Sequence, residues 1–84
     1  MSDFVTYVLE SDTSGRLYIG HTGDLGRRLY EHSTGQSKAT RGRGPWRLLH
    51  AEPAPSRAEA MRVETWLKAQ KSARSVRAWV GKRR

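Results

Sequence analysis

Two short apolar runs near the start of this 84-residue chain, separated by a turn-rich segment, constrain the fold more than any other feature. The runs occupy residues 4–9 and 17–20, and residues 11–15 between them read Ser-Asp-Thr-Ser-Gly. Apolar runs that flank turn-forming residues with a glycine are typical of a β-hairpin. The sequence therefore predicts that the chain begins with two paired antiparallel strands.

Each strand of this hairpin carries one tyrosine. A turn symmetric about Asp12 and Thr13 places Tyr7 directly opposite Tyr18, so both phenols share one face of the sheet. Because side chains alternate between faces, the opposite face is predicted to pack on the core. That face carries Phe4, Thr6, Val8, Leu17 and Ile19.

Capping residues and periodicity predict the elements that follow. Asp24 is a suitable N-cap for a helix over residues 25–34, which Gly35 ends. Residues 36–45 are polar, glycine-rich and basic, and we expect a mobile loop there. Residues 46–52 alternate between apolar and polar side chains and predict a third strand.

Two further helices complete the predicted order ββαβαα. Residues 56–59 carry the Ser-x-x-Glu pattern of a capping box, after Pro53 and Pro55 break the third strand, and predict a helix that ends near residue 70. Apolar residues at helical spacing after Ser72 predict a last helix. A chain of this length is expected to form a single domain over residues 1–84.

The composition narrows the classes of partner and chemistry. Sixteen Lys and Arg against eight Asp and Glu give a formal net charge of +8, which favours a polyanionic partner such as a nucleic acid. The absence of cysteine excludes disulfides, thiolate nucleophiles and cysteine-bound zinc. No apolar stretch of membrane-spanning length and no secretory signal are evident, so we expect a cytoplasmic protein without a membrane partner.

Three polar side chains interrupt otherwise apolar helix faces. Arg28 and His32 share one face with Leu25 and Leu29, and Glu64 lies at the edge of the apolar arc of its helix. An arginine offers a planar fork of donors to phosphate oxygens, and a carboxylate offers a hard ligand for Mg²⁺ or Mn²⁺. These residue types are the ones that phosphodiester hydrolysis requires.

The tyrosines and His32 fit the same chemistry. A tyrosine base must overcome a pKa of about 10, which a guanidinium and a metal ion lower by favouring the phenolate. His32 lies one turn beyond Arg28 and can orient a tyrosine or accept its proton.

Each candidate also has a structural interpretation. Arg27 is a competitor for the role of Arg28, and Lys68 can pair with Glu64 at i, i+4 on an exposed helix. His32 can instead act as a cation at a helix C-terminus. The remaining histidines, His21 and His50, are expected to be structural or surface residues.

The pattern resembles the GIY-YIG endonuclease family. The signature pair corresponds to Val5-Thr6-Tyr7 and Tyr18-Ile19-Gly20, although the first triplet differs from Gly-Ile-Tyr. Arg28 and His32 match the arginine and histidine of the following helix, and Glu64 matches the metal-binding glutamate. The similarity is closest to the small bacterial stand-alone members.

This resemblance extends over residues 4–71 and implies an α+β fold with a three-stranded antiparallel sheet flanked by helices, the GIY-YIG fold. It also implies a single divalent metal, Mg²⁺ or Mn²⁺, on Glu64. Tyr7 is then the general base, Tyr18 helps to place water or phosphate, and Arg28 stabilises the charge of the transition state.

We therefore expect a metal-dependent endonuclease that hydrolyses DNA, with single-stranded or structured DNA favoured and no small-molecule cofactor. The alternative is a non-catalytic, basic nucleic-acid-binding module on the same scaffold. The sequence leaves the oligomeric state open. The expected contacts to substrate are Arg27, Lys38, Arg41, Arg43 and Lys68.

Overall fold

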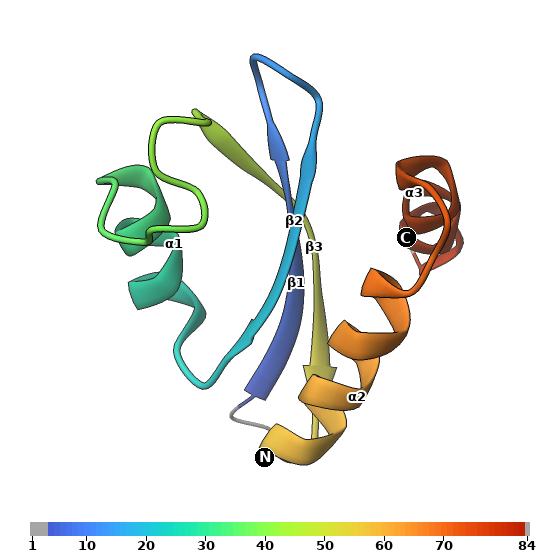
Figure 1. Ribbon diagram of the computed structural model, residues 1–84. Coiled ribbons are helices and arrows are strands. Elements are labelled where there is room, and N and C mark those ends of the chain that lie inside the picture. Colours follow the sequence, from blue (N-terminus) through green and yellow to red (C-terminus); the bar gives the residue numbers. More distant parts are fainter. Residues whose placement is uncertain (1–3, 84) are drawn as a thin grey trace.

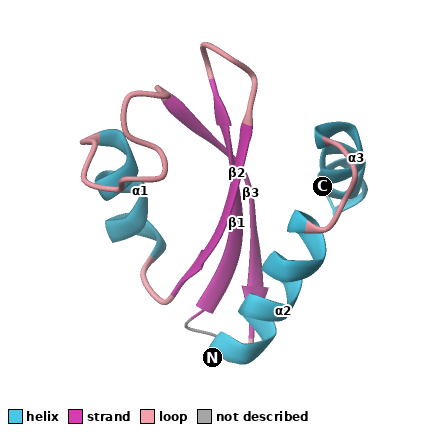
Figure 2. Ribbon diagram, viewed as in Figure 1, coloured by secondary structure: helices cyan, strands magenta, loops and turns pink. Residues whose placement is uncertain are grey.

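The computed structural model describes residues 4–83 and has the predicted order ββαβαα (Figures 1 and 2). The three strands form one antiparallel sheet in the order β2-β1-β3, with α1 on one side of it and α2 and α3 on the other (Figure 1). The elements are β1 (Phe4–Ser11), β2 (Leu17–Thr22), α1 (Leu25–Ser33), β3 (Trp46–Ala54), α2 (Arg57–Lys68) and α3 (Ala73–Arg83).

The strand pairing of the hairpin differs from the prediction by two residues. Tyr7 pairs with Gly20, and Tyr18 pairs with Leu9. Since a shift of two residues returns every side chain to its original face, Tyr7 and Tyr18 still share one face, as diagonal neighbours. Their ring centroids are 6.3 Å apart.

The hairpin loop explains this shift. Gly15 adopts a left-handed backbone with φ of 74° and donates its N–H to the carbonyl of Ser11 at 2.9 Å. Ser11 in turn donates its N–H to the carbonyl of Arg16 at 2.9 Å, which closes the loop. The pairing is therefore centred between Thr13 and Ser14, one residue later than predicted.

Gly20 makes room for the tyrosine opposite it. A Cβ at this position would lie 2.7 Å from the Tyr7 hydroxyl oxygen and 3.2 Å from Cε2 of Tyr18. The first distance is far below van der Waals contact, so only glycine lets the Tyr7 ring cross the face of β2.

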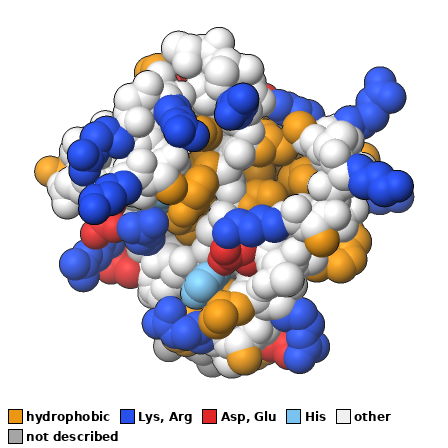
Figure 3. All heavy atoms as spheres, in the orientation of Figure 1, with side chains coloured by type: hydrophobic (Ala, Val, Ile, Leu, Met, Phe, Trp, Pro, Cys, Tyr) orange, Lys and Arg blue, Asp and Glu red, His pale blue; other side chains and the backbone are white. Residues whose placement is uncertain are grey.

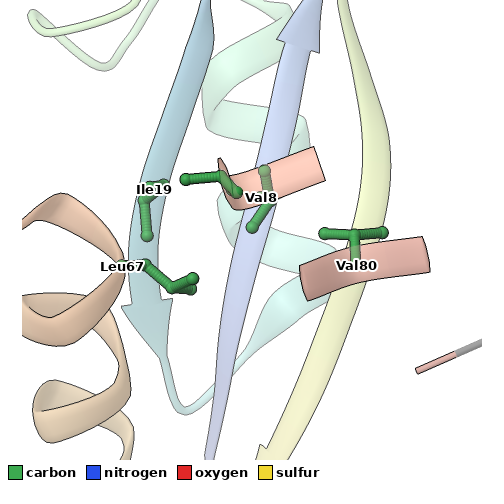
Figure 4. Close-up of a cluster of buried hydrophobic side chains, with 5 residues drawn as sticks. Val8, Ile19, Leu67 and Val80 are labelled. Atoms are coloured by element: carbon green, nitrogen blue, oxygen red, sulfur yellow. The ribbon is translucent and has the colours of Figure 1, made fainter. Parts of the chain in front are cut away.

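The opposite face of the sheet, predicted to face the core, packs on α2 and α3. Its buried cluster joins side chains from both strands of the hairpin to both helices, as Figure 4 shows. Beside the cluster, the Thr6 hydroxyl donates to the carbonyl of Ala60 in α2 at 2.7 Å, which satisfies a buried polar group. The cluster consists of Val8, Ile19, Leu67, Val76 and Val80.

Most predicted element ends agree with the structure. Asp24 accepts from Arg27 N–H at the start of α1, and Ser56 accepts from Glu59 N–H at the start of α2. The third strand is longer than predicted, because it continues through Pro53 to Ala54. β3 is an edge strand paired with β1 alone, and an edge strand tolerates a residue without an N–H.

Within residues 4–83, no helix has both the length and the apolar character required to cross a bilayer.

Substitution Gly20→Ala is expected to lower the free energy of unfolding by about 1–3 kcal/mol, because the added methyl group overlaps the Tyr7 hydroxyl. Urea unfolding followed by circular dichroism measures this change. Gly81→Ala in α3 is the matched control, since a Cβ there meets nothing within 4 Å and alanine favours a helix. Equal stability of the two variants would contradict the packing role of Gly20.

Candidate active site

A buried hydrogen-bonded chain joins β1, α1 and the loop that follows α1. The Tyr7 hydroxyl lies 2.9 Å from Nε2 of His32, and Nδ1 of His32 lies 2.7 Å from the hydroxyl of Thr40. These residues are 0%, 4% and 1% exposed, so the chain is shielded from bulk water. Each polar atom in it depends on its neighbour, because a buried group without a partner is costly.

Burial determines the protonation of this chain. It raises the pKa of the Tyr7 phenol, and the nearby Arg28 guanidinium opposes this shift without reversing it. Burial and the charge of Arg28 lower the pKa of His32. A protonated Tyr7 therefore donates to Nε2 of a neutral imidazole, which carries its proton on Nδ1 and donates to Thr40. The guanidinium therefore acts on Tyr7 in the expected direction, but burial outweighs it, and the described residues together raise the pKa of Tyr7.

Thr40 belongs to a loop that is anchored at several points, where the sequence predicted mobility. The indole Nε1 of Trp46 donates to the carbonyl of Thr40 at 3.0 Å, and the Ser11 hydroxyl donates to the carbonyl of Arg43 at 2.6 Å. Loop polarity alone did not distinguish Thr40 from its neighbours, so its contact with His32 was missed.

Aromatic rings surround the hydrogen-bonded chain. The ring of Tyr18 packs edge-on against His32 with centroids 5.0 Å apart and against Trp46 at 6.4 Å. Tyr18 is half-buried, and its ring centroid lies 6.3 Å from that of the buried Tyr7 ring.

The two neighbouring arginines, Arg27 and Arg28, lie in different environments. The Arg28 side chain is 31% exposed and interacts with Tyr7, whereas Arg27 is 76% exposed. Both bind Glu31, which accepts from Nη1 of Arg28 at 2.7 Å and from Nε of Arg27 at 3.2 Å. The interaction with Tyr7 contributes most to raising the pKa of Arg28 above its ordinary value, so Arg28 is a permanent cation near the phenol. Glu31 was not among the predicted site residues.

Glu64 in α2 contacts the edge strand β2 through His21. Its Oε1 lies 2.6 Å from Nδ1 of His21 in β2, and its Oε2 lies 2.6 Å from Nζ of Lys68. Its negative charge contributes to raising the pKa of Tyr7, which ties it electrostatically to the same site. Burial disfavours the carboxylate, but hydrogen bonds from Lys68 and His21 outweigh burial and lower the pKa of Glu64.

His21 thus contacts a predicted site residue, although sequence reasoning assigned it no catalytic role. Its contact with Glu64 spans 43 residues of sequence, and no local pattern signals a contact over such a separation. Lys68 forms the i, i+4 pair that we considered as the structural role of Glu64.

The residues at Glu64 fit a divalent cation held by one protein ligand. Mg²⁺ commonly binds through one or two carboxylates and completes its shell with water and substrate phosphate. Residues 4–83 contain no cluster of three or more His, Asp or Glu side chains that would enclose a metal. A cation on Oε2 must displace the Lys68 ammonium, which predicts weak metal binding.

The predicted substrate contacts lie on exposed parts of the chain. Lys38, Arg41 and Arg43 are exposed on the loop after α1, and Nε of Arg41 donates to the carbonyl of Gly35 at 2.8 Å. Figure 3 shows Lys and Arg side chains around the rim of one face, with hydrophobic side chains exposed at its centre. This surface carries charge that suits a phosphate backbone.

Comparison with known families places this α+β fold in a nuclease-type family. The profile described as "GIY-YIG catalytic domain" matches residues 3–77, and the chain belongs to the GIY-YIG family. This confirms the family and the fold that the sequence predicted.

Similar proteins are found in bacteria and in the archaeon Halobacterium salinarum. A UPF0213 protein of Streptococcus agalactiae is 49% identical over 63 residues, which cover 74% of this chain and 70% of the relative. A UPF0213 protein of Halobacterium salinarum is 46% identical over 63 residues, covering 74% and 80%. The solution structure of a UPF0213 protein from Bacillus halodurans is 40% identical, with a TM-score of 0.59 over 93% of this chain and 82% of that one.

His32 is expected to remain neutral at pH 6.5, the ordinary pKa of histidine, with its proton on Nδ1. Nitrogen-15 NMR of the imidazole reports both the pKa and the tautomer. Because the unfolded chain binds this proton more readily, the stabilising contribution of His32 is complete above about pH 6.5 and is lost as pH falls through the lower, folded pKa. Protonation of His32 at or above pH 6.5 would contradict the buried chain.

Proposed function

We propose that this protein is a divalent-metal-dependent endonuclease that hydrolyses DNA phosphodiester bonds, with single-stranded or structured DNA favoured. The observation that carries the proposal is the buried Tyr7–His32–Thr40 hydrogen-bonded chain, with the charge of Arg28 acting on the Tyr7 phenol. A structural tyrosine in a sheet does not need a buried histidine and a cation brought to it from a helix.

The buried chain supplies a route for a proton. Tyr7 is fully buried, so the route requires the site to admit the attacking water when substrate binds; Tyr7 then accepts the water's proton as its own proton passes to Nε2 of His32, which lies 2.9 Å away. The resulting imidazolium is held by its Nδ1–H on Thr40. This coupled transfer avoids a free phenolate, which the raised pKa of Tyr7 disfavours.

Positive charge at the phosphate comes from two directions. Arg28 is partly exposed beside Tyr7 and donates to the nonbridging oxygens, where negative charge grows in the transition state. Glu64 would hold Mg²⁺ or Mn²⁺, which supplies Lewis-acid stabilisation when bound. Lys68, displaced from Glu64, then becomes free to contact a backbone phosphate. Arg27 and the loop residues Lys38, Arg41 and Arg43 contact the backbone outside the reacting group.

One observation favours a second candidate, a nucleic-acid-binding module without turnover. Both oxygens of Glu64 are already engaged, one by His21 and one by Lys68. An internally neutralised carboxylate needs no metal, and the basic surface suffices for binding. A panel of labelled single strands, duplexes, flaps and RNA with Mg²⁺ and Mn²⁺ separates the candidates, since the module binds in a salt-dependent manner and cleaves none of them.

Glu64→Ala is expected to abolish DNA cleavage and to leave binding within a few-fold, because Glu64 acts on the metal and repels the phosphate backbone. Cleavage of end-labelled DNA and fluorescence anisotropy measure the two effects, and EDTA should reproduce the loss of cleavage in the unaltered protein. Glu59→Ala is the matched control, since Glu59 lies on the same helix and pairs only with Arg62 among the described ion pairs. Cleavage that persists in EDTA would rule out metal dependence.

Arg28→Ala is expected to raise the activation barrier by about 2–4 kcal/mol, equivalent to a loss of about 30- to 1,000-fold in kcat. Arg27→Ala tests the same charge change one residue away and should cost only a few-fold, mostly through KM, because its side chain faces solvent. Single-turnover cleavage separates the two contributions. Similar losses in both variants would remove Arg28 from the transition state.

A further inference from the structure

A hollow of about 490 Å³ lies directly beside the buried hydrogen-bonded chain. It is bounded by the end of α1, by the loop glycines Gly35, Gly42 and Gly44, and by His32 and Trp46. A second hollow of about 310 Å³ shares the walls formed by His32 and Trp46. The first volume falls within the range of about 300–1,000 Å³ that small-molecule sites occupy.

The wall of this hollow combines an aromatic ring with backbone polar groups. The Trp46 indole is half-buried, and its Nε1–H is held by the carbonyl of Thr40 at 3.0 Å, which fixes the ring. A Cβ on Gly44 would lie 2.8 Å from Cδ1 of Trp46, so glycine at this position lets the indole lie against the loop. Glycines also leave backbone N–H and C=O groups accessible for hydrogen bonds.

The position of the hollow relates it to the substrate. His32 lines the hollow and contacts the Tyr7 hydroxyl with Nε2. The Trp46 ring packs edge-on against Tyr18, with ring centroids 6.4 Å apart. A strand whose phosphate lies at Tyr7 therefore has a neighbouring nucleotide next to this hollow.

The surrounding charge favours a nucleotide over an apolar peptide. Lys38, Arg41 and Arg43 are exposed on the loop that forms the wall, and the ion pairs of residues 4–83 include none of them. A fixed aromatic ring within a basic groove is the combination that binds unpaired bases.

We propose that the Trp46 hollow binds the unpaired base of the nucleotide adjacent to the scissile phosphate. The inference rests on the proposed function for the position of the phosphate. Because a base inside a duplex does not reach such a hollow without leaving its stack, the hollow selects for single-stranded segments. Trp46 is then a specificity residue, whereas Trp66, exposed on α2 across the sheet, is not.

The test is a set of binding measurements on DNA with single abasic sites. EDTA prevents cleavage, so binding is measured alone. An abasic site is moved along a short fluorescent single strand, and Kd is measured by anisotropy at each position. For the unaltered protein, loss of the base at one position is expected to raise Kd by about 5- to 150-fold, the range for one stacked base. Trp46→Leu should weaken binding of the intact strand by a similar factor and flatten the abasic profile.

Two further variants make the result specific. Ser33→Phe fills the hollow from the end of α1 while keeping Trp46, and it should flatten the profile in the same way. Trp66→Ala removes an exposed tryptophan elsewhere and should leave both the affinity and the profile unchanged. The NMR signal of His32 verifies that the site is intact in every variant.

Each contrary outcome overturns the proposal. A flat profile for the unaltered protein means that phosphates alone are bound, and a profile that survives both Trp46→Leu and Ser33→Phe places the base elsewhere. Equal affinity for duplex and single strand removes the selection for unpaired bases. If the abasic-site and variant results agree with the proposal but no substrate is cleaved, base binding in the hollow stands and the endonuclease proposal is refuted.

Discussion

The burial of the Tyr7 hydroxyl against His32 is the contact on which the rest of the site depends. The ring crosses the face of β2 because Gly20 has no side chain there, and its polar end then requires a partner inside the protein. His32 supplies that partner, and its second nitrogen requires another, which is Thr40. One polar group in the sheet thereby fixes the rotation of α1 and anchors the loop over residues 36–45.

The strand order explains how two layers contribute to one site. α1 and α2 lie on opposite sides of the sheet, so side chains from both can meet only around an edge (Figure 1). β2 is such an edge strand, with Tyr18 on the α1 side and His21 directed to Glu64 of α2. A wider sheet, with another strand beyond β2, would separate Glu64 from Tyr7. Under the proposed function, the narrow three-stranded sheet is therefore what lets residues of α1 and α2 contribute to one site.

Local signals in the sequence predicted the elements, their order and the face shared by Tyr7 and Tyr18. The predicted register was wrong because the true register depends on the left-handed conformation of Gly15. The shared face of Tyr7 and Tyr18 was still correct, because the register shift was two residues, an even number. The phase of the helix also favoured Arg28, whose orientation agrees with its interaction with Tyr7. Thr40 was not predictable in this way, since a polar residue in a loop carries no periodicity and its role arises only when the chain folds back on α1.

Under the proposed function, the charges around Glu64 couple the cation to the proton on Tyr7. In the described residues, the Lys68 ammonium and His21 hold Glu64, and the phenol is neutral because burial outweighs the effect of Arg28. A doubly charged ion held by Glu64 would lower the pKa of Tyr7 and so ease the passage of its proton to His32, because nearby positive charge favours the loss of that proton. The base then becomes competent only when the charge needed at the phosphate is also present. A shielded tyrosine with a high pKa is therefore suited to be a base that acts only in the assembled complex.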